Sequence, residues 1–248
     1  MIDQQYLNNL VFYRTGEFPC SYLDDRPSRT LFLDPDVPLT PELLEILNLN
    51  GFRRSGHHVY RPDCVGCTQC QSSRILVKEF RWRRSLKRVL KLNEDLDIKV
   101  VPNEFTQEHY ELFELYVNTR HADGDMYPTS PENYQDFLIS NFEQARLVEF
   151  RLHDKLIAAS CIDLFQTGPS AIYTYFDPKY SSRSPGTMAV LFLVKLAERM
   201  NMPFVYLGYW IKDSEKMAYK AKFQPLEVYI GTKWYVLAAD LAANLVAK

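Results

Sequence analysis

Hydrophobic and polar positions follow two different periods in the second half of the chain. Apolar residues recur at helical spacing over 107–120 and again over 186–200, which predicts two amphipathic helices. Between them lie three runs with the composition of strands, at 146–152, 155–165 and 170–176. A His-Asp pair and a Thr-Gly-Pro triplet separate these runs, so we expect an antiparallel meander joined by tight turns.

Shorter patterns predict the remaining elements. Thr40 and Pro41 are typical of a helix start, and an apolar run follows them as far as Leu47. Further helices are predicted at 85–93, from Ser130 onward and at 214–222. Further strands are predicted at 74–82, at 204–209 and, as one or two strands, between 226 and 237. This order predicts a mixed α/β fold in which the meander feeds a crossover unit.

The composition is that of an ordinary globular protein. Of 248 residues, 46% are hydrophobic and 24% are charged, and glycine and proline together number only 23 (9 plus 14). A largely disordered chain is therefore excluded. The net charge is −2, so any nucleic acid must be bound by a local basic patch rather than by the whole surface.

The two halves of the chain differ in character. Four of the five cysteines precede residue 91, whereas the pattern becomes regular beyond Pro102. We therefore expect a domain at 1–100 that carries the cysteines and a basic patch, followed by a second domain at 101–248. The start of the chain lacks the features of a signal peptide, and the longest apolar run, 188–194, is too short to cross a bilayer. These features predict a cytoplasmic protein without a membrane partner.

The cysteines form the sharpest local motif. Cys64, Cys67 and Cys70 recur every third residue around Gly66, a spacing at which three thiols can converge on one ion. Cys20 is the expected fourth ligand, and His57 and His58 are the next candidates. Zinc and an iron–sulfur cluster both suit such ligands, and either would be structural here. The alternative is a group of reduced thiols that binds nothing.

A second motif is a dense run of basic residues. The segment 74–91 holds eight of the 29 lysines and arginines against a single acid, Glu79. The basic residues are Arg74, Lys78, Arg81, Arg83, Arg84, Lys87, Arg88 and Lys91. Such a patch can contact phosphates, and Phe80 and Trp82 offer stacking surface. The alternative is an ordinary solvated helix face.

Two further segments carry residues suited to binding. Arg183, Ser184 and Gly186 come directly before a predicted helix, where backbone N–H groups favour an anion. The segment resembles the pyrophosphate loop of acetyl-coenzyme A-dependent acetyltransferases, although a plain helix cap has the same pattern. Tyr209 and Lys220 form the second group and can meet an acidic or phosphate group, unless the tyrosine is core and the lysine is solvated.

Taken together, these motifs resemble the arginyl-tRNA–protein transferases and their bacterial relatives, the aspartate/glutamate leucyltransferases. The matching segments are Gly51-Phe52-Arg53-Arg54-Ser55-Gly56, Tyr60-Arg61-Pro62, the cysteine motif, Arg120-His121 with Gly124 and Met126, Tyr173-x-Tyr175-Phe176-Asp177-Pro178, Arg183-Ser184-x-Gly186-Thr187, Tyr206-Leu207-Gly208-Tyr209-Trp210-Ile211 and Lys216-Met217-x-Tyr219-Lys220. They run from about Cys20 to Trp234. One departure is Pro185, where the family pattern has leucine.

The resemblance implies an enzyme that moves leucine from leucyl-tRNA to the N-terminal Asp or Glu of a protein, which marks that protein for degradation. It also implies an acetyltransferase-like fold with a smaller cysteine-containing domain. The partners would be leucyl-tRNA and acidic protein N-termini, with no DNA. The chemistry itself would need no cofactor, because the aminoacyl ester is already activated.

Each step of this reaction suggests candidate residues. The amine needs a base, for which Asp177 or His121 is the candidate, and the N–H groups near Gly186 could receive the oxyanion. Tyr175 is placed at the same catalytic site. The acceptor carboxylate and the other substrate groups are assigned to Arg54, Arg74, Arg183, Ser184, Tyr209 and Lys220. The tRNA is assigned to Arg81, Arg83, Arg84, Lys87 and Arg88.

Three other readings remain open on the sequence. The first is transfer of arginine from arginyl-tRNA, since donor choice depends on the shape of a pocket. The second is an acetyl-coenzyme A-dependent N-acetyltransferase, which the same fold would accommodate. The third is a zinc-ribbon-like RNA-binding module with no catalytic role.

Overall fold

The computed structural model describes residues 8–122, 124 and 126–237 and divides the chain into two compact units. Unit 1 is built from 1–81 and 206–248, and unit 2 from the continuous segment 82–205. The expected division into 1–100 and 101–248 differs from this, because the chain returns to unit 1 after residue 205. Among the described residues no helix is both long and apolar enough to cross a membrane.

Unit 2 is a sheet covered by helices. Its strands, in the spatial order β11-β10-β9-β8, are β8 (Asp97–Pro102), β9 (Ala145–Leu152), β10 (Lys155–Leu164) and β11 (Pro169–Phe176). Each strand pairs antiparallel with its neighbour. Its helices are α3 (Arg84–Leu92), α4 (Gln107–Arg120), α5 (Pro131–Leu138) and α6 (Pro185–Arg199). The meander and these four helices confirm the pattern predicted from the sequence, whereas β8 was not predicted.

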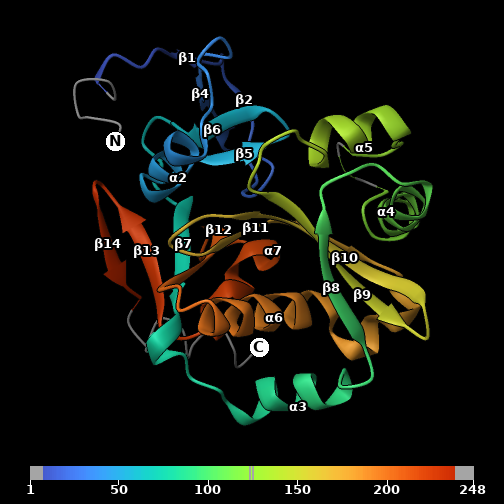
Figure 1. Cartoon of the computed structure of the whole chain (residues 1–248). Coiled ribbons are helices and arrows are strands. Elements are labelled where there is room, and N and C mark those ends of the chain that lie inside the picture. The colour runs from blue at the N-terminus through green and yellow to red at the C-terminus, as the bar shows by residue number, and fades with distance from the viewer. Residues whose placement is uncertain (1–7, 123, 125, 238–248) are drawn as a thin grey trace. The chain divides into compact units, whose positions relative to one another are not determined.

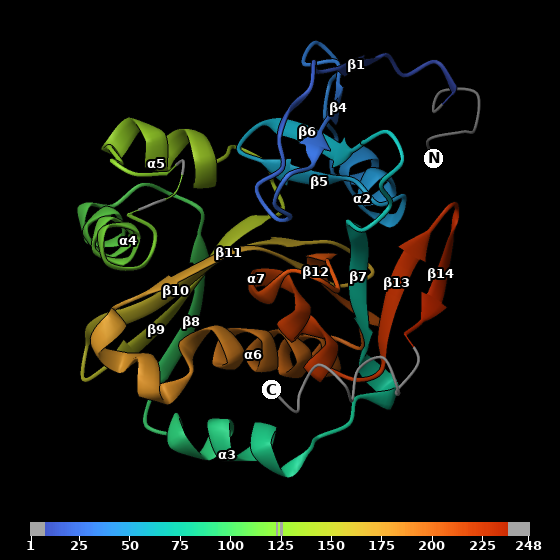
Figure 2. The same ribbon diagram turned by 180° about the vertical axis from the view of Figure 1, so that it is seen from behind.

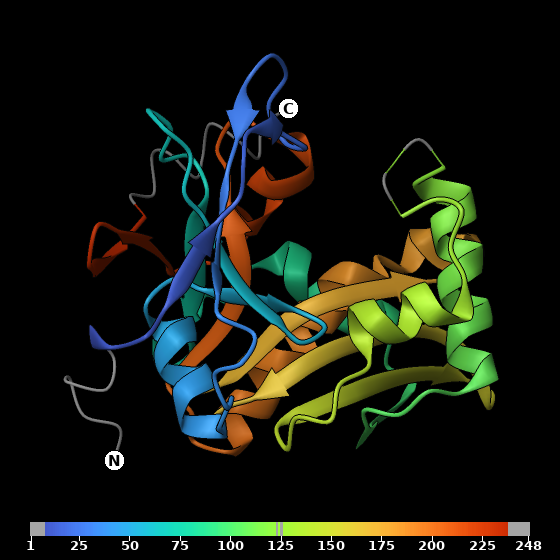
Figure 3. The same ribbon diagram turned by 90° about the horizontal axis from the view of Figure 1, so that it is seen from above.

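Side-chain alternation along β9 shows that helices cover both faces of this sheet. Leu147 belongs to the core cluster that α4 and α5 complete, and Glu149 accepts a hydrogen bond from a side chain of α4. Phe150, the next residue, meets Phe192 of α6 with 6.0 Å between ring centroids. Because neighbouring residues of a strand point to opposite faces, α4 and α6 lie on opposite sides of the sheet (Figures 1 and 3). Helix α3 packs on the outside of α6, as both Figure 1 and Figure 2 show.

The turn between β10 and β11 depends on its glycine. Gly168 has φ +150°, and a Cβ at this position would lie 1.8 Å from the carbonyl oxygen of Phe204. The amide of Phe204 in turn donates to Thr167 O at 3.1 Å. No residue with a side chain fits this close approach of two backbones.

Unit 1 contains short strands from both ends of the chain. A four-stranded sheet has the order β1-β4-β6-β5. Its strands are β1 (Phe12–Arg14), β4 (Thr30–Leu33), β5 (Arg53–Ser55) and β6 (His58–Pro62), and β2 (Phe18–Pro19) pairs with β3 (Pro27–Ser28) nearby in sequence. Helix α2 (Pro41–Leu49) starts as predicted, with Thr40 accepting a hydrogen bond from the amide of Leu43.

A second group of strands in unit 1 has the order β14-β13-β7-β12. It comprises β7 (Gln71–Leu76), β12 (Phe204–Trp210), β13 (Leu226–Ile230) and β14 (Lys233–Val236). The strand predicted at 74–82 begins earlier and gives way to the 3₁₀ turn η1 (Val77–Glu79). The helix predicted at 214–222 is divided into α7 (Glu215–Ala218) and the 3₁₀ turn η3 (Tyr219–Lys222).

Candidate functional site

Unit 1 contains a cavity of about 360 Å³ beside the end of β6 and the start of β7. Tyr209 forms part of its wall, and its hydroxyl donates to Gly51 O and Tyr60 O at 3.2 and 3.3 Å. The ring of Tyr229 lies so close to Gly51 that a Cβ there would meet it at 2.9 Å, and φ at Gly51 is +85°. Glycine at this position is therefore needed for the cavity to have this wall.

The cysteine motif forms another part of the same cavity wall. Cys64, Cys67 and Cys70 all line it, and the amide of Cys67 donates to Cys64 O in the turn that contains Gly66, with φ +70°. The pKa of the Cys70 thiol is raised to about 12, first by burial and then by Cys20 and the two other thiols of the motif. The structure thus brings the four predicted ligands into one neighbourhood, with Cys20 among them.

Four thiolate ligands suit zinc or an iron–sulfur cluster in their chemistry, but the positions of these four side chains do not form a metal site. Among the described residues, no three His, Cys, Asp or Glu side chains are arranged to hold a metal ion. The Sγ of Cys64 instead accepts from the amide of Arg29 at 3.4 Å and lies 3.5 Å from the hydroxyl of Ser28. The metal therefore stays a prediction.

Two arginines expected to bind the acceptor carboxylate have other partners in unit 1. Arg74, on β7, donates from Nε to Glu227 Oε2 at 2.6 Å, and its guanidinium lies 4.2 Å from the ring centre of Trp234. Arg54, on β5, is buried and donates to Gly56 O at 3.2 Å. The contacts of Arg74 join β7 to β13 and β14, and that of Arg54 lies in the turn after β5, so both guanidinium groups already have partners within this chain.

Lys220 is also committed to its surroundings. It is buried in η3 and donates to Tyr209 O at 2.7 Å. Burial lowers the pKa of its ammonium to about 7, and Arg53 contributes to the shift by repulsion. The structure thus brings Lys220 and Tyr209 together through the backbone of the tyrosine, and their joint contact with an acidic or phosphate group stays a prediction.

Arg61 has a guanidinium without a hydrogen-bond or ion-pair partner among the described residues, and it was not among the residues predicted to bind substrate. It lines the cavity, half-buried, with its guanidinium 4.8 Å from the ring centre of Phe52. No side-chain hydrogen bond or ion pair joins it to any residue the structure describes. In the sequence it is only one residue of the Tyr60-Arg61-Pro62 segment, and nothing there distinguishes it from its neighbours.

In unit 2, Asp177 is a structural carboxylate. It is buried, caps η2 (Pro178–Arg183) by accepting from the amide of Lys179 at 3.0 Å, and pairs with Lys155 Nζ at 3.0 Å. Burial acts to raise its pKa, but the Lys179 amide and the Lys155 ammonium outweigh this effect, and the pKa lies below its ordinary value. A carboxylate held in this way is a weak base.

His121 is placed differently, at the C-cap of α4, with its ring partly exposed. The ring lies 5.2 Å from that of Tyr116, which in turn is 4.9 Å from Phe176. The guanidinium of Arg120 lies 5.7 Å from the ring centre of Phe176. The structure therefore brings the predicted Arg120-His121 segment onto the aromatic residues at the end of β11.

Tyr175 is part of the core of unit 2. Its side chain is fully buried, its hydroxyl lies 2.8 Å from that of Tyr134, and its pKa is raised well above the ordinary value by burial. Gly186 lies in the first turn of α6, after Ser184 with φ +55° and Pro185. Pro185 has no N–H, and the amide of Thr187 donates to Ser184 O at 3.0 Å, so the predicted anion site depends on the amide of Gly186, which has no acceptor among the described residues.

Arg183 links the C-terminal end of α3 to the segment before α6 by hydrogen bonds. Its Nη1 and Nη2 donate to the two carboxylate oxygens of Asp95 at 2.7 and 2.9 Å, and Nη1 also donates to Leu92 O at 3.0 Å. Asn93 returns a hydrogen bond to Arg183 O at 2.9 Å. The planar fork of the guanidinium is thus already filled by a carboxylate of this chain.

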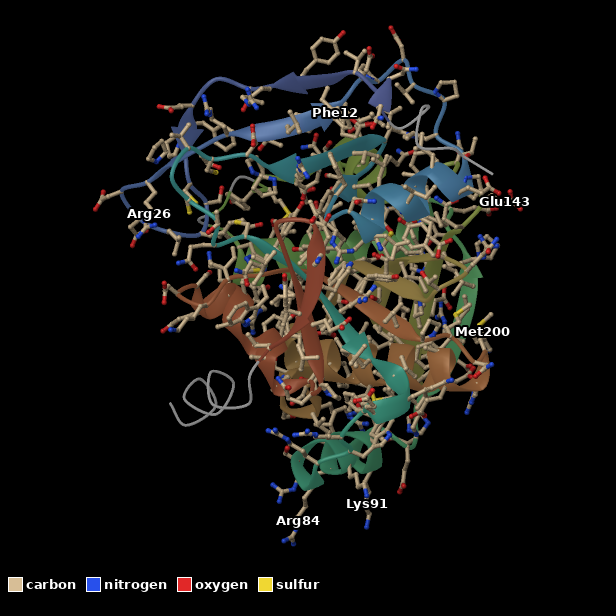
Figure 4. All side chains as sticks on the ribbon, turned by 90° about the vertical axis from the view of Figure 1, so that its left-hand side faces the viewer. Phe12, Arg26, Arg84, Lys91, Glu143 and Met200 are labelled. Carbon is tan, nitrogen blue, oxygen red and sulfur yellow. The ribbon has the colours of Figure 1, made fainter. Side chains whose placement is uncertain are left out.

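The predicted basic run is divided between the units. Arg81 belongs to unit 1, whereas the remaining cations predicted to contact tRNA precede or lie on α3 of unit 2. These are Arg83, Arg84, Lys87 and Arg88, and Lys91 lies on the same helix. All five are exposed and have no ion-pair partner among the described residues, while Leu86 anchors the helix as its buried residue. Figure 4 shows Arg84 and Lys91 pointing away from the ribbon.

Two family models match the chain. Arginine-tRNA-protein transferase, N terminus, matches residues 18–88, and arginine-tRNA-protein transferase, C terminus, matches residues 108–230.

Solved structures show only weak likeness. The C-terminal DUF2156 domain of a protein from Agrobacterium fabrum is 16% identical with a TM-score of 0.47, covering 84% of this chain and 69% of that one. FemX is 10% identical with a TM-score of 0.46, covering 97% and 91%. The mixed α/β architecture is confirmed by the elements themselves, and the acetyltransferase-like assignment stays a prediction.

Protein relatives are much closer in sequence. An aspartate/glutamate leucyltransferase of Chromohalobacter salexigens is 47% identical over 232 residues, 93% of this chain and 94% of that protein. Those of Alcanivorax borkumensis and Hahella chejuensis are 44% and 42% identical, over 92% and 93% of this chain and 94% and 99% of the relatives. Since such identity extends along nearly the whole chain and both units, this protein belongs to the aspartate/glutamate leucyltransferase family.

Proposed function

We propose that this enzyme transfers leucine from leucyl-tRNA to the α-amino group of a protein that begins with Asp or Glu, and so marks that protein for degradation in the cytoplasm. The observation that carries the proposal is the 42–47% identity to proteins named for this activity, over about 93% of the chain. Those relatives and this chain have nearly the same length.

The proposed reaction is an acyl transfer between two bound substrates. The amine nitrogen attacks the leucyl carbonyl, the bond between carbonyl carbon and ribose oxygen breaks, and an amide forms. A base takes a proton from the amine, and the departing ribose oxygen receives a proton. Since the ester is already activated, alignment of the two substrates is the main task of the protein.

Of the two candidate bases, His121 is the better supported. Asp177 is buried and pairs with Lys155, and its lowered pKa leaves it ionised and weakly basic. The imidazole of His121 is partly exposed, and imidazole exchanges protons near neutral pH. Of the N–H groups near Gly186, its own amide remains the candidate oxyanion donor, because that of Thr187 donates to Ser184 O.

The acceptor arm of leucyl-tRNA is assigned to the exposed face of α3. Its cations have no acid partner in the described structure and are presented together by a helix that Leu86 and the Arg183–Asp95 pair hold in place. Neutralised phosphates release counterions, so binding through this face depends steeply on salt. A Lys87→Gln, Arg88→Gln variant should lower the slope of log affinity against log salt by roughly 2, and exposed Lys212→Gln should not change it.

One transfer assay tests the proposal. Purified protein is mixed with labelled leucyl-tRNA or arginyl-tRNA and with peptides that differ only in a first residue of Asp, Glu, Lys or Ala. We expect label from leucyl-tRNA on the Asp and Glu peptides alone. Label from arginyl-tRNA would identify arginine as the donor, and acetylation by acetyl-coenzyme A without tRNA would replace the proposal altogether.

A further inference from the structure

The cavity of unit 1 contains a polar surface that the fold itself does not use. Arg61 lines a cavity of about 360 Å³, and its guanidinium lies over the face of Phe52 without a hydrogen-bond or ion-pair partner among the described residues. Gln71 and Thr68 line the same space, and neither side chain has a hydrogen-bond partner among the residues the structure describes. Polar groups that are withdrawn from water in folded proteins are mostly satisfied, so the two half-buried groups among these, Arg61 and Gln71, indicate a ligand; Thr68 is exposed and adds only a polar edge.

The charges around the cavity have opposite signs at two neighbouring positions. Asp63 follows Arg61 by two residues and also lines the cavity, with one of its oxygens paired to Arg14. No hydrogen bond from the described residues reaches its other oxygen, Oδ1. A ligand that complements this wall carries a negative group for the arginine and a positive group for the aspartate.

We propose that this cavity binds the first residue of the acceptor protein, with the guanidinium of Arg61 gripping the side-chain carboxylate of its Asp or Glu. This inference rests on the proposed function and adds to it the site that selects the acceptor. Asp63 then lies where it attracts the α-ammonium group before the amine loses its proton. A guanidinium matches a carboxylate through two parallel N–H···O bonds, which gives both affinity and orientation.

The other arginines assigned to this role have no comparable freedom. Arg74 already pairs with Glu227 and Arg183 with Asp95, both through carboxylates of this chain. Arg54 is buried and bonded to a backbone carbonyl. Binding of substrate by any of them would break a contact within this chain, whereas Arg61 would lose only its stacking on Phe52.

A phosphate of the tRNA fits the cavity less well. Sites that follow a nucleic-acid backbone use several cations in a row, and this wall offers one free cation next to an aspartate. Asp63 is paired with Arg14 through Oδ2, but its Oδ1 remains able to accept from an ammonium group and offers nothing to a phosphodiester. The acceptor N-terminus is therefore the occupant that the charges favour.

The test compares Arg61→Met with the wild-type protein. Methionine keeps an apolar stem on Phe52 but removes the charge, so the wall of the cavity should persist. Two peptides are used that differ only in a first residue of Asp or Asn, and KM for each is measured together with KM for leucyl-tRNA. Lys212→Gln is the matched control, because it removes one exposed positive charge of the same unit outside the cavity.

We expect Arg61→Met to raise KM for the Asp peptide about 10- to 100-fold, to abolish the preference for Asp over Asn, and to leave KM for leucyl-tRNA within twofold. Arg61→Lys should restore part of the preference but not the full affinity. Unchanged KM for the Asp peptide, or a loss confined to leucyl-tRNA, would overturn the proposal.

Equilibrium binding of fluorescent Asp- and Asn-headed peptides, without tRNA, separates this inference from the proposed function. Tighter binding of the Asp peptide that Arg61→Met abolishes supports the site even if no leucine is transferred. If the wild-type protein transfers leucine and the variant keeps its preference for Asp, the proposed function stands and the site is wrong. Thermal unfolding of each variant confirms that the comparison is made between folded proteins.

Discussion

The hydroxyls of Tyr134 and Tyr175 satisfy each other in the core of unit 2, 2.8 Å apart and without exposure to solvent. Tyr175→Phe removes one partner and leaves the other buried hydroxyl unpaired, which costs about 1–3 kcal/mol. We therefore expect this variant to unfold at lower denaturant concentration but to transfer leucine at nearly the wild-type rate. Urea unfolding and the transfer assay measure the two effects.

The double variant Tyr134→Phe, Tyr175→Phe is the control for this prediction. Replacing both partners leaves no polar group unsatisfied, so it should recover most of the lost stability. A single variant that is fully stable but inactive would instead give Tyr175 a catalytic role.

At the scale of residues, the sequence identifies which side chains have the chemistry to bind a substrate. It does not show which of them are already paired within the folded chain. Arg74 and Arg183 were predicted to bind substrate because they are cations within motifs, yet their carboxylate partners lie 153 and 88 residues away in the chain. Arg61 was overlooked because its distinguishing property is the lack of a partner, which only the folded chain reveals. The cysteines were easier, since three of the four are neighbours in sequence.

At the scale of elements, long periodic segments were predicted well. Helix α4 spans 107–120 as expected, and the three strands of the meander start and end within one residue of their predicted limits. The strands of the N-terminal region were missed, because elements of two to five residues are too short to show a period. Of these strands, β1, β4 and β6 pair with strands that are not their neighbours in the chain, which no local pattern reveals.

Helix α3 gives the first prediction at this scale. Arg183→Ala removes the hydrogen bonds to Asp95 and Leu92, which hold the C-terminal end of α3 in place. Amide exchange in α3 should become faster, and the affinity for leucyl-tRNA should fall several-fold, because the basic face is no longer held in one orientation. KM for the acceptor peptide should not change, and hydrogen exchange with mass spectrometry locates the effect.

Asp95→Asn is the companion variant, since it weakens the same contact from the other side. If the Arg183–Asp95 contact acts as one unit, the double variant should lose about as much affinity for leucyl-tRNA as either single variant. That loss should be smaller than the sum of the two single losses. A rise in acceptor KM with unchanged exchange in α3 would show that Arg183 binds substrate after all.

The contact between α4 and β9 gives a second prediction at this scale. Arg151 bridges Glu149 and Glu108, and His109 lies 2.8 Å from the other oxygen of Glu149. Hydrogen bonding to Arg151 is the main cause that lowers the pKa of both glutamates below their ordinary value. Their stabilising effect is complete above the pKa of the unfolded chain, near 4.3, and is lost as pH falls through the lower pKa of the folded state.

The wild-type protein should therefore lose stability as pH falls below about 4.3, and Glu149→Gln should show a shallower loss there. The same variant should be less stable than wild type at pH 7. Melting temperatures recorded between pH 3 and 7 measure both effects. Parallel curves for the two proteins would show that this carboxylate does not contribute to acid unfolding.

At the scale of the whole molecule, the chain order does not match the spatial order. The C-terminal strands β13 and β14 return to unit 1, where Glu227 pairs with Arg74 and Trp234 packs on the same guanidinium. No local pattern announces this return, so a division of the sequence into two consecutive domains was the natural expectation. The net charge of −2 did not reveal the basic face of α3 either, because acidic residues elsewhere in the chain offset its positive charges.

This topology predicts that the two units depend differently on chain continuity. Residues 82–205 are continuous and contain the core of α4, α5 and the meander, so this fragment should fold alone with cooperative unfolding. Residues 1–81 lack β13, and with it the strand that pairs with β7 and the carboxylate that neutralises Arg74. That fragment should remain unfolded until a peptide covering 206–248 is added, when dispersed NMR signals should appear. If 1–81 folded without the peptide, the C-terminal strands would be an appendage rather than a part of unit 1.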